Sequence, residues 1–395
     1  MKRNEKVAIR IRPLAPDERE KSGIAIAFRL DDRVVVLRDS DEVDKRPNRV
    51  REKKFIFDRA LGPDATQKEV YEKTAKHLID GILDGYNATV FAYGATGAGK
   101  TYTMVGTSER PGVMARALDD LFKSVNKTGN HNQYYVRMSY CEIYNEQIKD
   151  LLQPSTTALE LREDHRGLVY VQGLSEIKAT SSRDMLEHLV QGNRRRTCEP
   201  TARNQTSSRS HAILLINVTL KEDLPSEVKM KHTKEMGRLV LIDLAGSEKV
   251  GDGNMNDARL KEGAHINKSL LALGNVINTL SEKGAKFVNY RDSKLTRLLK
   301  DSLGGNSITV MIANISPAPI HYEETRNTLV YADRAKNITN KASFSFTNRS
   351  CDGNSQNFML KDNDIFLFLL RANLKINSKC DFLNTNWEKN AKTLS

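Results

Sequence analysis

An eight-residue glycine-rich stretch constrains what this chain can fold into more than any other feature. It fits the pattern G-x-x-x-x-G-K-S/T and directly follows Ala88–Tyr93, an apolar run typical of a buried strand. Glycines let the backbone turn tightly and bring successive N–H groups against phosphate oxygens, and a helix that begins near Gly99 directs its positive end at the same anion. The stretch comprises Gly94, Ala95, Thr96, Gly97, Ala98, Gly99, Lys100 and Thr101. It therefore predicts a nucleotide-binding site.

Size and charge define the broad class of protein. A chain of 395 residues is long enough for one large α/β domain or for two ordinary domains. Its net charge of +12 predicts attraction to a polyanionic partner: nucleic acid, an anionic membrane or an acidic protein surface. Four widely spaced cysteines predict reduced thiols and no metal site. No apolar run is long enough to span a bilayer or to form a signal-peptide core, so a cytoplasmic location without a membrane partner is expected.

The first candidate strand, Val7–Arg12, alternates in polarity and ends at Pro13. Its two arginines, Arg10 and Arg12, share one face of the strand. Two interpretations remain open for this face. It is either an exposed polar surface, which this segment alone favours, or a place where guanidinium groups and Pro13 rest against a nucleotide base.

Periodicity predicts further elements along the chain. A capping box at Thr66–Glu69 predicts a helix that continues to about Asp84. The other expected elements are a charged surface loop or hairpin at Asp39–Lys54, strands at Tyr134–Tyr144 and Leu168–Val171, a short helix at Gln147–Leu152, and helices at Ser182–Asn193 and about Glu323–Asn337.

A hydroxyl-rich segment, Asn204–Ser210, precedes His211 and a strand expected at Ala212–Leu220. In isolation, an ordinary polar loop explains this segment as well as a functional loop does. Beside a phosphate-binding loop, its hydroxyl groups become candidate ligands of Mg²⁺ and of a γ-phosphate. His211 is interpreted as a structural histidine rather than a catalytic one.

A hydrophobic strand at Arg238–Asp243 ends in a carboxylate, the position at which P-loop proteins hold Mg²⁺. The strand continues into Leu244–Glu248, where the N–H group of Gly246 can sense a γ-phosphate. In the glycine-rich stretch, Lys100 can place its ammonium group on the β- and γ-phosphates, and Thr101 can bind the metal. Three separate segments therefore indicate one bound triphosphate.

These segments, in this order, resemble a kinesin motor domain, and the resemblance extends from about Lys6 to Lys341. It also includes Arg10-x-Arg12-Pro13, Gly85–Asn87, Ile266–Ile277, Tyr290–Thr296, Asp301–Asn306 and Ala335–Lys336. Glu199–Thr201 and the basic loop at residues 46–54 are similar to the kinesin-8 branch. The resemblance implies an α/β fold of the P-loop NTPase type, with a central, mostly parallel or mixed β-sheet and helices on both faces. It also implies a motor domain (residues 1–336), a neck linker (337–341) and an Asn- and Ser-rich extension of unknown structure (342–395).

The resemblance assigns roles around the nucleotide. The base would be bound by Arg10, Arg12, Pro13 and Tyr102; the phosphates by Lys100 and the loop amides; Mg²⁺ by Thr101 and Ser208, with Asp243 acting through water; and the γ-phosphate by Ser207 and Gly246. Tyr102 can stack on a base although many relatives have histidine there. Arg209 and Glu248 would form a salt bridge that closes the site over ATP. Glu248 would also accept the proton of the attacking water, directly or through a second water.

The resemblance also implies how hydrolysis becomes movement. The helix at about Asn267–Ser281 has apolar residues on more than one stripe, as expected for a helix that packs on the domain and also docks to a partner. Asn267 would link this helix to the loop after Asp243. Nearby basic residues would meet the acidic surface of a microtubule, with a solvated basic face as the alternative. They are Lys249, Lys261, Lys268, Arg291, Lys294 and Arg297. The neck linker would dock when ATP is bound and detach after release.

The sequence and the resemblance therefore predict a microtubule-stimulated ATPase that uses ATP and Mg²⁺ and moves toward plus ends, with regulation of microtubule ends as a further expected role. The alternative is a slow, nucleotide-gated microtubule-end binder or depolymerase without processive movement. A nucleic-acid-dependent ATPase is suggested by charge alone, and the chain shows no recognition module for nucleic acid, so that partner is not expected. Dimerisation is left open because residues 342–395 show no sustained heptad pattern.

Overall fold

The computed structural model describes residues 6–21, 23–39, 52–127, 134–154, 157–165, 167–197, 208–222, 232–248, 257–282, 287–340 and 347–349. At residues 197, 222, 232–235, 257–267 and 347–349 it describes the backbone alone. The chain divides into two units, Met1–Phe346 and Thr347–Ser395. The second unit includes strand β15 (Thr347–Arg349), and the first contains the glycine-rich stretch and the sheet around it. The boundaries expected at residues 336 and 341 stay predictions.

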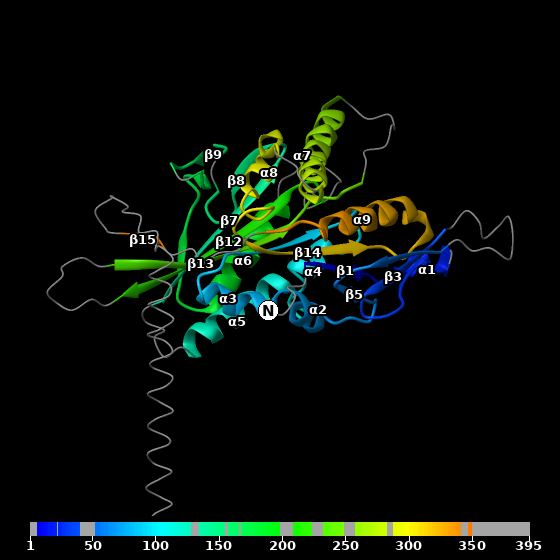
Figure 1. Ribbon diagram of the computed structural model, residues 1–395, viewed down its shortest axis with the longest axis horizontal. Coiled ribbons are helices and arrows are strands. Elements are labelled where there is room, and N and C mark those ends of the chain that lie inside the picture. Colours follow the sequence, from blue (N-terminus) through cyan, green and yellow to red (C-terminus); the bar gives the residue numbers. More distant parts are fainter. Residues whose placement is uncertain are drawn as a thin grey trace, which may run out of the picture. The chain divides into compact units, whose positions relative to one another are not determined.

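A mixed β-sheet forms the centre of the first unit (Figure 1). Its strands lie in the order β11 (Ile177–Ala179), β7 (Tyr134–Tyr144), β12 (His211–Glu222), β13 (His232–Asp243), β6 (Ala88–Tyr93), β14 (Ile308–Ile315), β1 (Val7–Ile11) and β5 (Arg59–Leu61). From β13 to β5 neighbouring strands are parallel, whereas from β11 through β7 and β12 to β13 each strand is antiparallel to its neighbour. The prediction of a mixed sheet is confirmed.

Strand β6 lies between β13 and β14 and is parallel to both. All six of its residues are buried, as expected for a strand that is covered on both faces of a sheet. The register places Asp243 opposite Ala92, so the carboxylate at the end of β13 lies beside the start of the glycine-rich loop. The topology therefore brings two of the predicted nucleotide segments together at one edge of the parallel strands.

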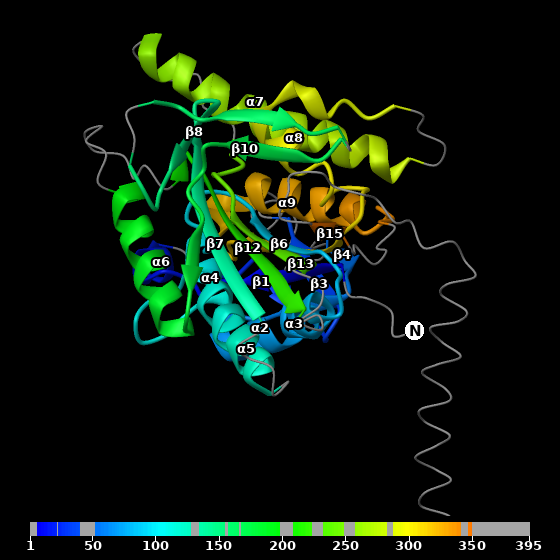
Figure 2. The same ribbon diagram turned by 90° about the vertical axis from the view of Figure 1, so that its left-hand side faces the viewer.

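Helices cover both faces of the sheet, as predicted (Figures 1 and 2). One face carries α2 (Gln67–Thr74), α3 (Lys76–Leu83), α4 (Lys100–Met104), α5 (Val113–Lys127) and α6 (Ser182–Thr197). The other carries α7 (Asp257–Ser281), α8 (Lys294–Leu298) and α9 (Tyr322–Ala335). A separate hydrophobic cluster fills each interface between sheet and helices. Within the described residues, no helix is both long enough and apolar enough to cross a membrane.

Smaller elements extend this core. Strands β2 (Ala27–Arg29), β3 (Val34–Arg38) and β4 (Glu52–Ile56) form an antiparallel sheet, and β9 (Glu160–Glu163) pairs with β10 (Val169–Gln172). Short helices occur at α1 (Pro16–Lys21), η3 (Tyr290–Asp292) and η4 (Pro319–His321). Strand β10 contacts α8, and Figure 2 shows both beside α7 on one side of the domain. Two segments far apart in sequence thus contribute to one surface.

The short helix predicted at Gln147–Leu152 is wrong. Strand β8 (Gln147–Asp150) pairs there with β7 in an antiparallel hairpin. The turn is made by Asn145 and Glu146, whose φ angles are 51° and 57°. Two consecutive left-handed residues match the twist of a two-residue hairpin turn, which reverses the chain before a helix can begin.

Several predicted helix bounds also change. Thr66 caps a helix as predicted, because its side chain accepts a hydrogen bond from the N–H group of Glu69. The helix breaks at Ala75, however, and continues as the separate α3. Helix α7 begins ten residues before the predicted start at Asn267. Among residues 268–281, whose side chains are described, Leu271 is 66% exposed, Leu280 is partly buried and the other apolar side chains are buried.

Candidate nucleotide site

The loop between β6 and α4 has a backbone that only glycine fits at its start. Gly94 has a φ of 144°, and a Cβ atom there would lie 2.2 Å from the carbonyl oxygen of Asn314 on β14. Gly97 and Gly99 also have positive φ angles, and Gly99 is the N-cap of α4. These angles are favourable for glycine and costly for other residues. The loop therefore has the exposed amides and helix N-terminus that suit a phosphate chain.

Lys100 lies under this loop and is only 6% exposed. Its ammonium group donates a hydrogen bond to the carbonyl oxygen of Ala95 at 2.9 Å. Burial lowers the pKa of Lys100, and the nearby carboxylates of Asp243 and Glu248 oppose that shift. A phosphate oxygen would supply the negative charge that a buried ammonium group favours. Lys100 therefore fits the predicted contact with phosphate.

The metal-binding prediction rests on Thr101, Ser208 and Asp243, and two of these residues are in direct contact. The hydroxyl of Thr101 donates to Oδ2 of Asp243 at 2.8 Å. Asp243 is fully buried, and its Oδ1 atom has no hydrogen-bond partner among the described residues. A buried carboxylate oxygen without a hydrogen-bond partner lowers the stability of the folded protein. A Mg²⁺ ion with its bound water would satisfy this oxygen, so these residues fit the metal.

Arg196, at the end of α6, belongs to the site although the sequence analysis assigned it no role. Its Nη1 atom donates to Oδ2 of Asp243 at 2.7 Å, and its Nη2 atom donates to the carbonyl oxygen of Ser210 at 2.7 Å. Arg196 is 2% exposed, and its Nε atom lies 3.8 Å from Oε1 of Glu142 on β7. This guanidinium group holds the Asp243 carboxylate beside Thr101.

Two loops that were predicted to sense the γ-phosphate are joined by main-chain atoms. The N–H group of Gly246 donates to the carbonyl oxygen of Ser208 at 2.8 Å. Next to it, the N–H group of Ala245 donates to Nδ1 of His211 at 3.0 Å. The other ring nitrogen of His211 lies 2.8 Å from the hydroxyl of Ser269 on α7. A continuous set of hydrogen bonds therefore runs from the nucleotide loops to α7, with His211 in a connecting position.

The geometry of His211 predicts a specific dependence of stability on pH. Burial lowers the pKa of His211 to about 3, whereas an unfolded histidine titrates near pH ~6.5. Above about pH 6.5 both states are neutral, and below it only the unfolded chain takes up the proton, so acid favours unfolding. We expect His211 to account for about 2 kcal/mol of lost unfolding free energy at pH ~5 relative to pH ~7.5.

Urea unfolding at these two pH values checks this expectation. His211→Asn should make the loss smaller, and His165→Asn, at an exposed position in the loop after β9, should leave it unchanged. An equal loss in both variants would contradict the assigned role of His211.

Glu248 contacts the phosphate loop in this structure. Its Oε2 atom accepts from the N–H group of Thr96 at 2.7 Å, and its Oε1 atom accepts from the Thr96 hydroxyl at 2.5 Å. A Glu248–Arg209 ion pair is not among the contacts of the described residues. That pair was expected for the closed, ATP-bound site, for which it stays a prediction. Ser207, expected beside it, lies outside the described residues.

The residues predicted to bind the base differ in their exposure. Arg10 is buried, so the interpretation of this strand face as an exposed polar surface is wrong. Its guanidinium carbon lies 5.2 Å from the centre of the Tyr102 ring, which is 39% exposed. Arg12 instead forms an ion pair with Glu18, and the hydrogen bonds from Arg12 lower the pKa of Glu18 to about 2. Tyr102 and the exposed Pro13 are therefore the accessible members of the predicted set.

Helices α7 and α8, which carry Lys268, Lys294 and Arg297, lie on the side of the domain shown at the top of Figure 2. Lys268 and Arg291 are exposed, and Lys294 and Arg297 are partly buried. Arg291 lies 4.0 Å from Glu163 of β9. Lys249 and the side chains of Lys261 and Asn267 lie outside the described residues.

Lys300, which the sequence analysis did not identify, forms an ion pair with Glu163 at 3.0 Å and so connects the end of α8 to the β9–β10 hairpin. The contact could not be predicted because the two residues are far apart in the sequence.

Comparison with known proteins identifies relatives that all belong to one family. The family model described as "Kinesin motor domain" matches residues 10–338. Kinesin-like protein KIF19 of Homo sapiens is 53% identical over 350 residues, which cover 87% of this chain and 35% of the relative. Kinesin-like protein KIN-8B of Arabidopsis thaliana is 47% identical over 339 residues, which cover 84% of this chain and 40% of the relative. The chain thus spans about a third of the length of several curated relatives.

Solved structures agree with the sequence comparison. A fast kinesin, described with implications for its ATPase mechanism and microtubule interactions, has a TM-score of 0.77 and 40% identity, with coverage of 91% of this chain and 98% of its own. A KIF14 dimer, with AMP-PNP and in complex with a microtubule, has a TM-score of 0.76 and 38% identity, with coverage of 87% and 96%. The KIN-8 relatives confirm the resemblance to the kinesin-8 branch. By its sequence, its fold and the order of its nucleotide loops, the chain belongs to the kinesin motor domain family.

Proposed function

We propose that this chain is a microtubule-stimulated ATPase motor that couples hydrolysis of ATP to microtubule binding and movement. The observation that carries the proposal is the set of hydrogen bonds that joins Gly246 to Ser208, Ala245 to His211, and His211 to Ser269. Any change at the γ-phosphate that moves Gly246 also acts on the loop at Ser208 and on helix α7. A nucleotide-dependent shift of that helix is what a motor needs in order to change its affinity for a filament.

Residues of the loops would bind and orient the triphosphate. Lys100 and the loop amides would neutralise the phosphates, while Thr101 and Ser208 would hold Mg²⁺, with Asp243 acting through a bound water. When bound, Mg²⁺ supplies positive charge that offsets the charge of the phosphates. Arg196 keeps the Asp243 carboxylate in place for this contact.

Catalysis would depend on positioning. Glu248 would leave Thr96, pair with Arg209 and accept the proton of the attacking water, directly or through a second water. Backbone groups of Ser207 and Gly246 would detect the γ-phosphate. Because phosphoryl transfer needs mainly alignment and charge neutralisation, no nucleophilic side chain is required.

The microtubule surface would include the basic residues around α7 and α8. Lys268, Arg291, Lys294 and Arg297 would contact the acidic filament, together with the predicted Lys249 and Lys261. The net charge of +12 supports this assignment because it favours encounter with an acidic polymer. A related motor, the KIF14 dimer, has been solved in complex with a microtubule.

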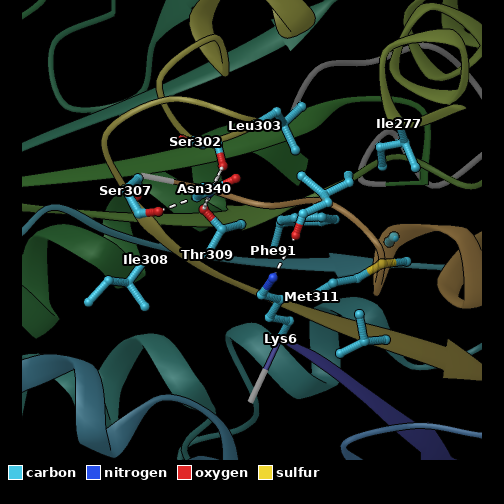
Figure 3. Close-up of a pocket in the computed structure, with 13 residues that line it drawn as sticks. Lys6, Phe91, Ile277, Ser302, Leu303, Ser307, Ile308, Thr309, Met311 and Asn340 are labelled. Carbon is cyan, nitrogen blue, oxygen red and sulfur yellow. Dashed lines mark hydrogen bonds between the residues drawn. The ribbon is translucent and has the colours of Figure 1, made fainter. Parts of the chain in front are cut away.

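The beginning of the proposed neck linker is docked on the domain. Nζ of Lys6 donates to the carbonyl oxygen of Ile338 at 2.6 Å, and Ile338 is 8% exposed. Figure 3 shows Asn340 beside Ser302, Ser307 and Thr309, with which it lines a pocket of about 90 Å³. Movement would be directed toward plus ends, because the linker follows the motor domain in the sequence. The site of action would be cytoplasmic microtubules.

Asn340 offers a test of the linker. Its Nδ2 atom donates to the carbonyl oxygens of Ser302 and Ser307, each at 2.9 Å, and its Oδ1 atom accepts from the N–H group of Gly304 at 2.9 Å. Asn340→Ala removes these bonds, so we expect microtubule gliding on a motor-coated surface to slow severalfold while stimulated ATP turnover stays within about twofold. Thr339→Ala, at the exposed neighbouring position, is the control. Equal gliding speeds for the two variants would reject a role for linker docking.

Comparison of ATP turnover with microtubules, soluble tubulin and DNA tests the proposed function. We expect strong stimulation by microtubules alone. Stimulation by soluble tubulin or filament ends would favour the slow end-binding alternative, and stimulation by DNA would overturn the proposal. Equal filament binding with ADP and with AMP-PNP would also overturn it, because coupling requires affinities that depend on the nucleotide.

A further inference from the structure

Gln67, the first residue of α2, is a buried amide that the function derived above does not use. It is 5% exposed. A buried amide group costs stability unless its donors and its acceptor find partners, so its contacts define its role. Helix capping does not explain it, because Thr66 provides the cap.

The two ends of the Gln67 amide bind different elements. Its Oε1 atom accepts from Nη1 of Arg10 on β1 at 2.7 Å. Its Nε2 atom donates to the carbonyl oxygen of Tyr102 on α4 at 2.6 Å, and more weakly to that of Arg110 at 3.4 Å. One side chain therefore fixes Arg10 and the backbone of Tyr102 relative to each other.

Arg10 in turn supports the Tyr102 ring from behind. Its Nη1 atom also donates to the hydroxyl of Thr103 at 2.9 Å, so this guanidinium nitrogen is held by two acceptors. The guanidinium carbon lies 5.2 Å from the ring centre, within the range of a cation–π contact. Arg10 is 8% exposed and Tyr102 is 39% exposed, so a ligand would meet the ring and not the guanidinium group.

We propose that Gln67 is a positioning residue for the nucleotide base, because it fixes the Tyr102 ring and the guanidinium group behind it. The inference rests on the proposed function, in which the base stacks on Tyr102. Among the described residues, the side chain of Gln67 makes hydrogen bonds only to Arg10, Tyr102 and Arg110, and none of these lies in the loop Gly94–Thr101. The loop is reached only indirectly, because Arg10 donates to the Thr103 hydroxyl, which donates to the carbonyl oxygen of Gly99 at 2.8 Å. Gln67 therefore acts more directly on the base contact than on the phosphates.

The test compares a ligand that has a base with one that lacks it. In the full chain carrying Gln67→Met, the new side chain has a similar length but is apolar and lacks the amide. Binding of ADP and of inorganic tripolyphosphate, each with Mg²⁺, is measured by calorimetry. We expect the Kd of ADP to rise about tenfold, equivalent to about 1.4 kcal/mol, and the Kd of tripolyphosphate to change less than about twofold. Lys68→Met, at the exposed next position of α2, is the matched control for ADP binding.

Steady-state kinetics supply a second measurement. In Gln67→Met the KM for ATP should rise about tenfold with kcat within about twofold, because the base contact is lost equally from ground state and transition state. If this variant does not fold, Gln67→Glu replaces it. The carboxylate still accepts from Arg10 but cannot donate to the Tyr102 carbonyl oxygen, so ADP should bind at least about threefold more weakly and tripolyphosphate should bind as before.

Each other outcome overturns the inference. Equal weakening of ADP and tripolyphosphate would show that Gln67 merely supports the loop, and unchanged ADP binding would show that it does not position the ring. In both cases wild-type ATP turnover with microtubules still supports the proposed function. If the wild-type chain binds neither ligand, the proposed function fails and the inference fails with it.

Discussion

Replacing Glu248 with alanine should reduce microtubule-stimulated ATP turnover by roughly 100-fold or more, the range expected for loss of a positioned proton acceptor. Both carboxylate oxygens of Glu248 contact Thr96 of the phosphate loop in this structure, so the group already lies beside the expected γ-phosphate position. The alanine variant keeps Lys100 and the loop amides, so ATP should still bind. It should therefore remain in the ATP state and bind filaments tightly.

Turnover and filament co-sedimentation in the presence of ATP measure the two effects together. Glu323→Ala is the control, since Glu323 is exposed at the start of α9 and pairs only with Arg326 among the described residues. Unchanged turnover in Glu248→Ala would remove Glu248 from the catalytic step. Lost turnover with weak filament binding would indicate failed nucleotide binding instead.

Arg196→Met should lower the free energy of unfolding by about 3–5 kcal/mol, because it leaves the fully buried Asp243 carboxylate without its charged partner. Surface pairs behave differently, and most contribute less than about 1 kcal/mol. Arg326→Met, which breaks the exposed pair with Glu323, is therefore the matched control. Urea unfolding at pH ~7, followed by circular dichroism, gives both values.

A second substitution identifies the cause of the loss. Adding Asp243→Asn to Arg196→Met removes the unpaired charge and should recover part of the stability. If Arg196→Met costs no more than Arg326→Met, or if the double variant is less stable still, the buried pair does not have the assigned role.

Contiguous features of the site could be predicted from the sequence. Strand β6, the glycine-rich loop and the start of α4 form one unbroken segment, and glycine spacing with a preceding apolar run specifies them locally. Asp243 was predictable for the same reason, because it ends a hydrophobic strand. The sheet and its covering helices followed from the alternation of such segments and from the family resemblance.

Features that depend on tertiary contacts could not be predicted. Arg194, Arg195 and Arg196 are adjacent in sequence, and only the packing of α6 on β7 and β11 buries the third beside Asp243, 47 positions away. The turn at Asn145 and Glu146 contains no glycine, so asparagine, which tolerates a left-handed backbone, was its only local signal. Gln67 is a further example, since its capping-box position concealed the contact with Arg10.

The hydrogen bond between the Gly246 N–H group and the Ser208 carbonyl oxygen involves main-chain atoms alone. Substitution at position 208 leaves the acceptor intact. Position 246 has to stay glycine for a different reason, because a Cβ atom there would lie 2.2 Å from the Thr96 hydroxyl oxygen and 2.4 Å from Oε2 of Glu248. Apart from that requirement for glycine, the bond itself does not depend on the identity of a side chain. Evolution can therefore alter the speed of the chemical step through side chains such as Glu248 while the mechanical connection between the two loops is preserved.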